Sequence, residues 1–132
     1  MFVKKHQIGK VYDAPYDVVL GENNVFQPDI MFVSNENSKI IKEKNITGAP
    51  DLIIEILSPA TGYYDLTEKK ETYAEFGVKE YWIVDPKKQW VEFYSNESKK
   101  FKSIQRLEKS RILKSHTLSR FEMRMEKIFQ LN

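Results

Sequence analysis

Three charged residues of this sequence, Asp29, Glu55 and Lys69, lie in strand-like or helical segments at positions where apolar residues are expected. Two carboxylates on neighbouring strands, with an ammonium group nearby, can hold a hard divalent cation such as Mg²⁺ through oxygen ligands. Such a cation lowers the pKa of a bound water and stabilises negative charge on a phosphoryl oxygen. The lysine would position the nucleophile or neutralise the developing charge. These three residue types together predict a metal-dependent site for phosphoryl chemistry.

Glu55 lies in the middle of DLIIEIL, which spans residues 51–57. A run that is apolar on both faces is typical of a central, buried strand. Because side chains alternate between the faces of a strand, Ile53, Glu55 and Leu57 share one face. A lone buried carboxylate is costly unless it is neutralised, paired or bound to a metal. The pattern therefore requires a compensating group beside Glu55.

The segment Asp65–Phe76 (DLTEKKETYAEF) predicts a helix. Asp65 can cap its N-terminus, and Glu68, three residues later, completes a capping-box pair. Gly77 suits the left-handed position at which many helices end. The sequence therefore predicts both ends of this helix.

Lys69 lies on the apolar side of the predicted helix. At about 100° per residue, it falls within the stripe that Leu66 and Tyr73 define. One short connection joins the strand of Glu55 to this helix, so Lys69 is the expected partner of Glu55. A Glu–Lys pair inside a fold can also be a structural ion pair without chemistry, and the residues alone leave both interpretations open.

Asp29 follows Pro28 in the segment Val25–Val33 (VFQPDIMFV), which predicts a single strand. Pro28 has no amide hydrogen for a ladder, so it must lie at an edge, at a bulge or at a strand start. Asp29 is the second carboxylate on an apolar strand face, although a residue in this position can also be a turn or cap residue. Asp29 favours a metal site only because Glu55 and Lys69 are also charged residues at apolar positions.

Asp51 shares the strand face of Glu55 but lies four residues away, about 13 Å at strand rise. We therefore expect Asp51 to tether the loop Gly48–Pro50 rather than to join the site.

Strand-like segments lie on both sides of the predicted helix. They are residues 16–20, 25–33, 51–57, 80–84, 90–94 and 101–107. Strands mixed with one well-marked helix predict an α/β fold of the α+β kind, rich in hairpins in its second half. A chain of 132 residues suits one domain, residues 1–132, with one core.

Composition narrows the classes of function. The chain has no cysteine, which excludes disulfides, thiolate metal sites and cysteine nucleophiles. No stretch approaches the roughly 20 apolar residues of a membrane span and no signal peptide is present, so we expect a cytoplasmic protein without a membrane partner. Because 21 basic residues nearly balance 19 acidic ones, net charge does not indicate a nucleic-acid binder. Basic residues denser toward the C-terminus favour a solvated face, with a phosphate-facing patch as the alternative. They are Lys99, Lys100, Lys102, Arg106, Lys109, Arg111 and Lys114.

Four motifs follow one another in the chain: QPDIMFV, GAPDLIIEILSP, a helix with the spacing D-x-x-x-K-x-x-x-Y, and GVKEYWIVDP. Together they resemble the Uma-two family of putative restriction endonucleases, which belongs to the PD-(D/E)XK nuclease superfamily. The matching stretch spans Gln27 to Pro86. The resemblance implies a restriction-endonuclease-like fold, in which helices flank a central mixed sheet.

By this resemblance, Asp29 is the aspartate of the PD motif and Glu55 is the acid of the (D/E)XK strand. The lysine that normally follows this acid by two residues is absent, because Leu57 occupies that position. The family supplies the lysine from the following helix, where it corresponds to Lys69. The implied ligands of Mg²⁺ or Mn²⁺ are Asp29, Glu55 and the backbone carbonyl of Ile56, and the implied substrate is DNA.

Members of this family usually carry a further N-terminal segment with a helix and strands. We therefore expect a chain shortened at its N-terminus, with that helix missing and an apolar sheet face exposed, which favours homo-oligomers. One predicted function is a metal-dependent endonuclease that hydrolyses phosphodiester bonds in DNA. The alternative is a catalytically inactive or incomplete family member that serves as a binding or oligomerising domain.

Overall fold

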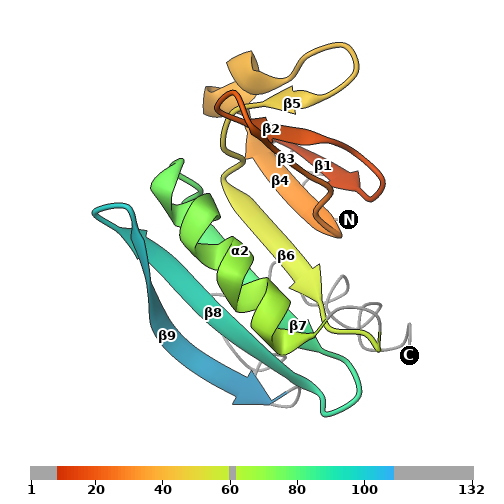
Figure 1. The fold of residues 1–132 in the computed structure, drawn as a ribbon, viewed down its shortest axis with the longest axis vertical. Helices are drawn as coiled ribbons and strands as arrows, with labels where there is room; N and C mark the ends of the chain where they lie inside the picture. Colours follow the sequence, from red (N-terminus) through yellow and green to blue (C-terminus); the bar gives the residue numbers. More distant parts are fainter. Residues whose placement is uncertain (1–8, 60–61, 109–132) are drawn as a thin grey trace.

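The computed structural model describes residues 9–59 and 62–108, which form a twisted sheet with one long helix across it (Figure 1). Lys109, Arg111 and Lys114 of the basic C-terminal segment lie outside the described residues. The prediction of one domain over residues 1–132 covers a longer range than the described residues, and it stays a prediction. Within the described part, no helix is both long enough and apolar enough to cross a membrane.

Two sheets and two helices make up the described elements. The six-stranded main sheet has the spatial order β1 (Gly9–Asp13), β4 (Ile30–Ser34), β6 (Leu52–Ile56), β7 (Glu80–Asp85), β8 (Trp90–Glu97) and β9 (Lys100–Glu108). The three-stranded sheet has the order β3 (Asn24–Phe26), β2 (Val18–Leu20) and β5 (Ile46–Thr47). The helices are the 3₁₀ helix η1 (Asn35–Ile40) and the α-helix α2 (Tyr63–Glu75).

In the main sheet, β6 and β7 are parallel and the other neighbouring strands are antiparallel. Parallel neighbours need a crossover connection of about a dozen residues or more, and α2 provides it. The crossover carries α2 over one face of the sheet, in front of β7 and β8 in Figure 1. This connection makes the strand of Glu55 and the helix of Lys69 face each other.

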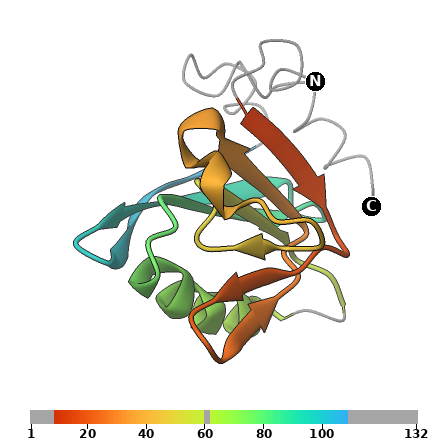
Figure 2. The same cartoon turned by 90° about the horizontal axis from the view of Figure 1, so that it is seen from above.

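The larger core lies between α2 and the main sheet. Ile53 of β6, Tyr81 and Ile83 of β7, and Leu66 and Tyr73 of α2 are fully buried there. The three-stranded sheet packs on the same side of the main sheet, next to α2 (Figure 2), and adds Val18, Leu20 and Ile46 to this core.

The opposite face of the main sheet carries a second apolar cluster. Its buried residues are Ile30, Leu52, Ile54, Trp82, Val84, Val91 and Phe93. Successive side chains of a strand point to opposite faces, so β6 and β7 supply both clusters. The central, doubly buried strand that the sequence predicts around Glu55 is confirmed.

The prediction of one strand over residues 25–33 is wrong. Residues 27–29 separate β3 from β4, and these two strands belong to different sheets. Pro28 lies in this interruption, where no ladder requires an amide hydrogen from it. The half-exposed edge strand β1 is a further strand that the sequence analysis did not predict.

The helix α2 begins at Tyr63, two residues before the predicted start. Gly62 is the N-cap residue and no side chain caps the helix, so the capping role predicted for Asp65 is wrong. Asp65 lies in the first turn instead, where its charge is favourable near the positive end of the helix dipole. The left-handed position predicted for Gly77 is confirmed by its φ of 99°.

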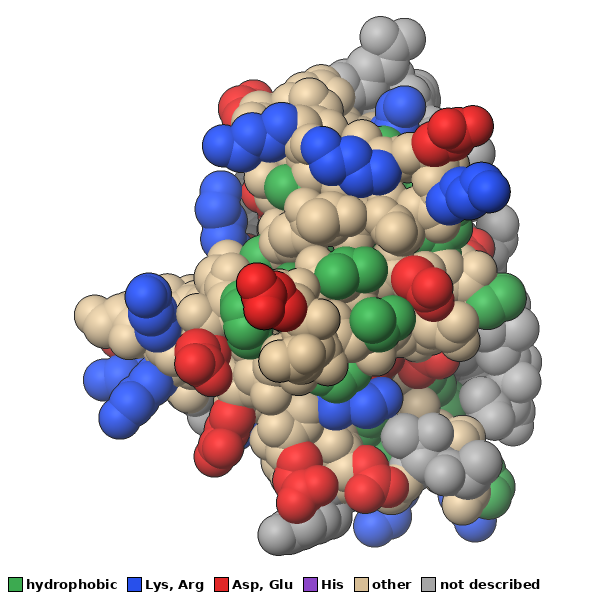
Figure 3. Space-filling model, turned by 45° about the horizontal axis from the view of Figure 1, so that its top comes forward, with side chains coloured by type: hydrophobic (Ala, Val, Ile, Leu, Met, Phe, Trp, Pro, Cys, Tyr) green, Lys and Arg blue, Asp and Glu red, His purple; other side chains and the backbone are tan. Residues whose placement is uncertain are grey.

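Three large apolar side chains are exposed in the described part of the chain, those of Val25, Tyr63 and Phe76. The apolar side chains on the two faces of the main sheet are largely buried, so the open sheet face expected from the sequence is not found among the described residues. Figure 3 shows acidic and basic side chains interspersed over one face of the molecule. Homo-oligomerisation stays a prediction.

Candidate active site

Strand β6 places Glu55 on the face of the main sheet that α2 covers. Glu55 is only 2% exposed. Its neighbour along this face, Ile53, and its register partner on β7, Ile83, are both fully buried. A carboxylate in these surroundings loses most of its hydration, which disfavours its charged form.

Three groups approach the carboxylate of Glu55. The backbone N–H of Asp29 donates a hydrogen bond to Oε1 at 3.0 Å. The ammonium group of Lys69 lies 3.4 Å from Oε2, and the hydroxyl of Tyr73 lies 3.5 Å from the same oxygen. Lys69 and Tyr73 are four residues apart on α2, so they share the helix face that covers Glu55.

Asp29 completes this arrangement from the segment that precedes β4. Its Oδ2 accepts a hydrogen bond from the backbone N–H of Ile56 at 2.7 Å. Asp29 therefore binds the main chain next to Glu55, while Glu55 binds the main chain of Asp29. The structure thus brings together Asp29, Glu55 and Lys69, which the sequence had singled out separately. We call these three residues the Glu55 site.

The backbone carbonyl of Ile56 is directed toward the side of β6 on which Asp29 lies. The N–H and C=O of one strand residue point to the same neighbouring strand, and the N–H of Ile56 points to Asp29. The β4–β6 ladder ends at the pairing of Ile30 with Ile54, so no ladder bond within the described residues reaches this carbonyl from β4. The carbonyl of Ile56 is therefore a candidate ligand atom at the end of β6.

The charge of Glu55 is only partly compensated. Burial raises the pKa of the Glu55 carboxyl above its usual value, and the nearby charge of Asp29 acts in the same direction. The ammonium group of Lys69 and the N–H of Asp29 lower the pKa but do not cancel the effect of burial. A further positive charge beside Glu55 would therefore be favourable.

Lys69 and Tyr73 offer different chemistry at Oε2 of Glu55. The side chain of Lys69 is 35% exposed, so its ammonium group can also reach a bound substrate. Tyr73 is fully buried, and burial together with the charge of Glu55 raises the pKa of its phenol. Tyr73 therefore stays protonated at neutral pH and can donate a hydrogen bond to Glu55. The sequence analysis treated Tyr73 as an apolar residue, although its spacing from Lys69 was a signal.

The oxygen atoms at the end of β6 fit a small, hard cation. Asp29, Glu55 and the carbonyl of Ile56 would supply its protein ligands, and Mg²⁺ is commonly bound by one or two carboxylates while it keeps several waters. In the described part of the chain, no three or more His, Cys, Asp or Glu side chains form a group that could hold a metal. An ion would therefore depend on two carboxylates, one carbonyl and oxygens from water or substrate.

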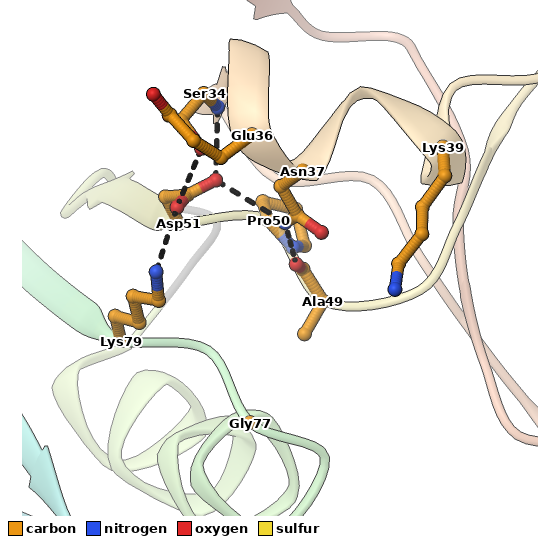
Figure 4. A pocket seen from close by; sticks show the side chains of 9 residues that line it. All are labelled: Ser34, Glu36, Asn37, Lys39, Ala49, Pro50, Asp51, Gly77 and Lys79. Carbon is orange, nitrogen blue, oxygen red and sulfur yellow. Dashed lines mark hydrogen bonds and ion pairs between the residues drawn. The ribbon is translucent and has the colours of Figure 1, made fainter.

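Asp51 lies near the other end of β6, in a group that we call the Asp51 cluster: Asp51, Ser34, Asn37 and Lys79. Its carboxylate accepts hydrogen bonds from the N–H of Ser34 at 2.8 Å, the hydroxyl of Ser34 at 3.0 Å and the amide of Asn37 at 3.2 Å (Figure 4). Lys79 forms an ion pair with it at 3.3 Å. The cluster borders a pocket of about 290 Å³ that Glu36 and Lys39 also line.

The Asp51 cluster fixes the start of η1 against the start of β6. The amide of Asn37 also donates to the carbonyl of Ala49 at 2.8 Å. The loop Gly48–Pro50 is thus held through Asn37. The described bonds of the Asp51 side chain run to Ser34, Asn37 and Lys79 rather than to the loop as expected. Asp51 takes no part in the described contacts of the Glu55 site.

Glu92 on β8 is a further buried carboxylate, and the sequence analysis missed it. It is 8% exposed and faces α2. Its Oε1 accepts hydrogen bonds from the hydroxyls of Tyr63 at 2.7 Å and Tyr94 at 3.0 Å. Its Oε2 accepts two from Arg106, at 2.7 Å and 3.1 Å. We call these four residues the Glu92 network.

Comparison with known proteins relates the chain to a sequence family and to solved structures. A sequence model of the Uma2 (Uma-two) family, described as "Putative restriction endonuclease", matches residues 1–126. Among solved structures, the chain is similar to a putative nuclease belonging to DUF820 from Anabaena variabilis, with a TM-score of 0.63 and 24% sequence identity. That match covers 77% of this chain and 57% of the other, so the chain spans little more than half of its length. No curated protein matches the chain. The likeness to the solved structure confirms the predicted mixed α+β fold.

Proposed function

Because the family model spans residues 1–126, this chain belongs to the Uma2 family of putative restriction endonucleases, and we propose that it is a metal-dependent endonuclease acting on DNA. One observation carries this proposal: the Glu55 carboxylate accepts a hydrogen bond from the N–H of Asp29, and the Asp29 carboxylate accepts one from the N–H of Ile56. The ammonium group of Lys69 lies 3.4 Å from the same Glu55 carboxylate. The reaction is hydrolysis of a phosphodiester bond.

We assign the ligand role to Asp29, Glu55 and the backbone carbonyl of Ile56. A Mg²⁺ or Mn²⁺ ion bound there would supply a Lewis acid that activates water and neutralises charge on the phosphoryl oxygens. The incomplete compensation of Glu55, whose pKa is raised by burial, supports this assignment because a cation would satisfy it. The Asp29–Ile56 hydrogen bond supports it too, since it holds two ligand-bearing segments together.

We assign to Lys69 the positioning of the attacking water and the stabilisation of charge on the phosphoryl group. Two features support this role. Lys69 remains partly exposed although it lies on the covered face of α2, and its Nζ is 3.4 Å from a carboxylate oxygen. Its donors can therefore face both Glu55 and a phosphate. The distance is long for a strong ion pair, so little is lost when the ammonium group moves toward substrate.

DNA is the proposed substrate because the family consists of putative restriction endonucleases. The net charge of the protein does not add support, because at +2 the attraction between the whole protein surface and the phosphate backbone of DNA is weak. We place the protein in the cytoplasm and expect it to act as a homo-oligomer, in which a second copy adds DNA-binding surface.

The direct test is cleavage of a supercoiled plasmid and of linear duplex DNA with Mg²⁺, Mn²⁺ or EDTA. We expect cleavage with either metal and none with EDTA. Asp29→Ala, Glu55→Ala and Lys69→Ala should each abolish cleavage while circular dichroism shows an intact fold. Metal should also raise the melting temperature of the wild type, because a ligand that binds only the folded state stabilises it. Asp29→Ala and Glu55→Ala should lose this shift.

A second candidate is a catalytically inactive or incomplete family member that acts as a binding or oligomerising domain. One observation favours it: both oxygens of Glu55 already have protein partners. A wild-type protein that never cleaves nucleic acid and shows no thermal shift with either metal would decide for this candidate. If Glu55→Gln lowers stability without changing any metal response, Glu55 and Lys69 form only a structural ion pair.

A further inference from the structure

The Glu92 network lies in line with the Glu55 site on the same face of the main sheet. Glu55 pairs with Ile83, Ile83 pairs with Glu92, and Glu92 pairs with Arg106. Register partners on neighbouring strands share a face, so all four side chains face α2. Three strand spacings of about 4.8 Å separate Arg106 from Glu55, or about 14 Å along the sheet.

Arg106 is held in one orientation by two contacts of different kinds. Its Nε and Nη2 atoms donate to Oε2 of Glu92 at 3.1 Å and 2.7 Å. Its guanidinium lies over the ring of Trp90, with Cζ 4.0 Å from the ring centroid. A guanidinium fixed by a carboxylate and an aromatic face loses little further entropy when it binds a ligand.

The same guanidinium keeps donors for a ligand. The side chain of Arg106 is 51% exposed, whereas that of Glu92 is 10% exposed. Glu92 takes up two of the five N–H groups of a guanidinium and the hydroxyl of Tyr63 interacts with Arg106 as well, so about two N–H groups remain for a ligand. Arg106 also compensates the buried charge of Glu92, so a test of ligand binding needs variants that separate the two roles.

We infer that Arg106 binds a backbone phosphate of the nucleic acid that the Glu55 site cleaves. This inference rests on the proposed function. Arginine matches phosphate in geometry and is favoured where phosphates are recognised. A separation of about 14 Å is short enough for one bound duplex to reach both the Glu55 site and Arg106. The net charge of the protein is only +2, so its surface as a whole attracts phosphate weakly. The fixed guanidinium of Arg106 would supply local affinity for the phosphate backbone of the nucleic acid.

The chain offers a matched control on the same strand. Lys102 of β9 pairs with Ser95, which faces the side of the sheet away from α2. Like Arg106, Lys102 is an exposed cation in an ion pair, here with Glu97 at 3.7 Å. Removing Lys102 lowers the charge by the same amount on the opposite face.

The experiment measures binding and cleavage separately. Binding of a fluorescent 20-base-pair duplex is followed in EDTA at several salt concentrations, and cleavage of the same duplex is followed with Mn²⁺. We expect Arg106→Ala to weaken binding about tenfold, and to reduce the slope of log K against log salt by about one, while Lys102→Ala stays near the wild type. Arg106→Ala should raise KM and leave kcat at saturating DNA nearly unchanged.

Two further variants separate phosphate binding from a structural role. Arg106→Lys keeps the charge beside Glu92 and should recover part of the affinity. The double variant Glu92→Gln with Arg106→Gln leaves no unpaired charge, so it should fold and still bind DNA as weakly as Arg106→Ala. Glu92 keeps its bonds from Tyr63 and Tyr94 in Arg106→Ala, which favours folding of that variant as well.

The outcomes distinguish the two proposals. If the wild type cleaves DNA but Arg106→Ala and the double variant bind it as tightly and with the same salt slope, the role of Arg106 is refuted and the proposed function stands. If Arg106→Ala and Lys102→Ala weaken binding equally, the effect is general charge and the role of Arg106 is likewise refuted. If the wild type neither cleaves nor binds DNA, both proposals fall.

Discussion

The carboxylates of Asp51 and Glu55 lie at opposite ends of β6, four residues apart, and their surroundings act on them in opposite directions. Burial alone would raise the pKa of Asp51, but the N–H of Ser34, the amide of Asn37, the hydroxyl of Ser34 and the ammonium group of Lys79 together lower it. For Glu55, burial raises the pKa, and Lys69 with the N–H of Asp29 does not offset it. The fold thus favours the charge of Asp51 and disfavours that of Glu55.

The difference follows from position in the fold. Asp51 lies just before β6, where η1 and the segment before β7 bring main-chain and side-chain donors close to it. Glu55 lies inside the strand under α2, where packing leaves room for one amide, one ammonium group and one phenol. Groups with a charge that the fold disfavours are concentrated at functional sites. On this physical ground we interpret Asp51 as structural and Glu55 as functional.

The largest effect that separates the two residues is on DNA cleavage. Glu55→Gln keeps the shape of the side chain but removes its charge, so cleavage with Mg²⁺ should fall by at least about 100-fold, as for loss of an essential acid or ligand. Asp51→Asn should leave kcat within about threefold of the wild type, because Asp51 makes no contact with the Glu55 site. Single-turnover cleavage of plasmid DNA measures both. Equal losses in the two variants would refute the distinction.

The next largest difference should lie between Lys69 and Lys79, the lysines that pair with Glu55 and Asp51, in the effect of their substitution on kcat. Lys69→Met should lower kcat by about 100-fold, because a donor to the phosphoryl group is lost. Its melting temperature should also fall, because the buried carboxylate of Glu55 loses its ammonium partner. Lys79 is 73% exposed, so Lys79→Met should change stability by less than about 1 kcal/mol and leave kcat unchanged. Steady-state kinetics and thermal unfolding of both variants test this pair. A Lys69→Met enzyme of normal kcat would leave Lys69 as a structural partner of Glu55.

Patterns within single elements predicted Glu55 and Lys69 from the sequence. Strand alternation placed Glu55 on an apolar face, and helical periodicity placed Lys69 in the stripe that covers it. The structure adds that the two side chains meet at 3.4 Å. Asp29 needed the family resemblance as well, because the residues alone left open a turn or cap role.

The contacts between distant segments could not be predicted. The hydrogen bond from Ile56 to Asp29 joins residues 27 apart, and it depends on the register of β4 on β6, which no local pattern contains. Glu92 carried the same signal as Glu55, a carboxylate on a strand face between Trp90 and Tyr94. Its partners come from α2 and β9, so only their arrangement in space reveals the network.

Unfolding in the absence of metal should give changes of opposite sign for the two carboxylates. Asp51→Ala leaves the donors of Ser34, Asn37 and Lys79 without their acceptor, so the free energy of unfolding should fall by about 1–3 kcal/mol. Glu55→Gln removes a charge that burial disfavours and keeps an acceptor, so its free energy of unfolding should stay equal or rise by up to about 1 kcal/mol. Urea denaturation at pH 7 measures both changes. A clear loss of stability in Glu55→Gln would favour a structural pair with Lys69.

The smallest effect lies in the pH dependence of stability, and here too the two residues should differ in sign. The pKa of Asp51 is lowered from 3.8, so its stabilisation is present above that value and is lost as the pH falls through the native pKa. The pKa of Glu55 is raised from 4.5, so the folded protein loses stability as the pH rises from about 4.5 through the native pKa. At pH 7 the wild type should therefore be more stable than Asp51→Asn and less stable than Glu55→Gln. Both differences in the free energy of unfolding should shrink as the pH is lowered toward 3, where the carboxyls become protonated.

Urea denaturation of the three proteins between pH 3 and pH 7, without metal, tests this prediction. A difference between the wild type and Glu55→Gln that does not change with pH would contradict the raised pKa of Glu55.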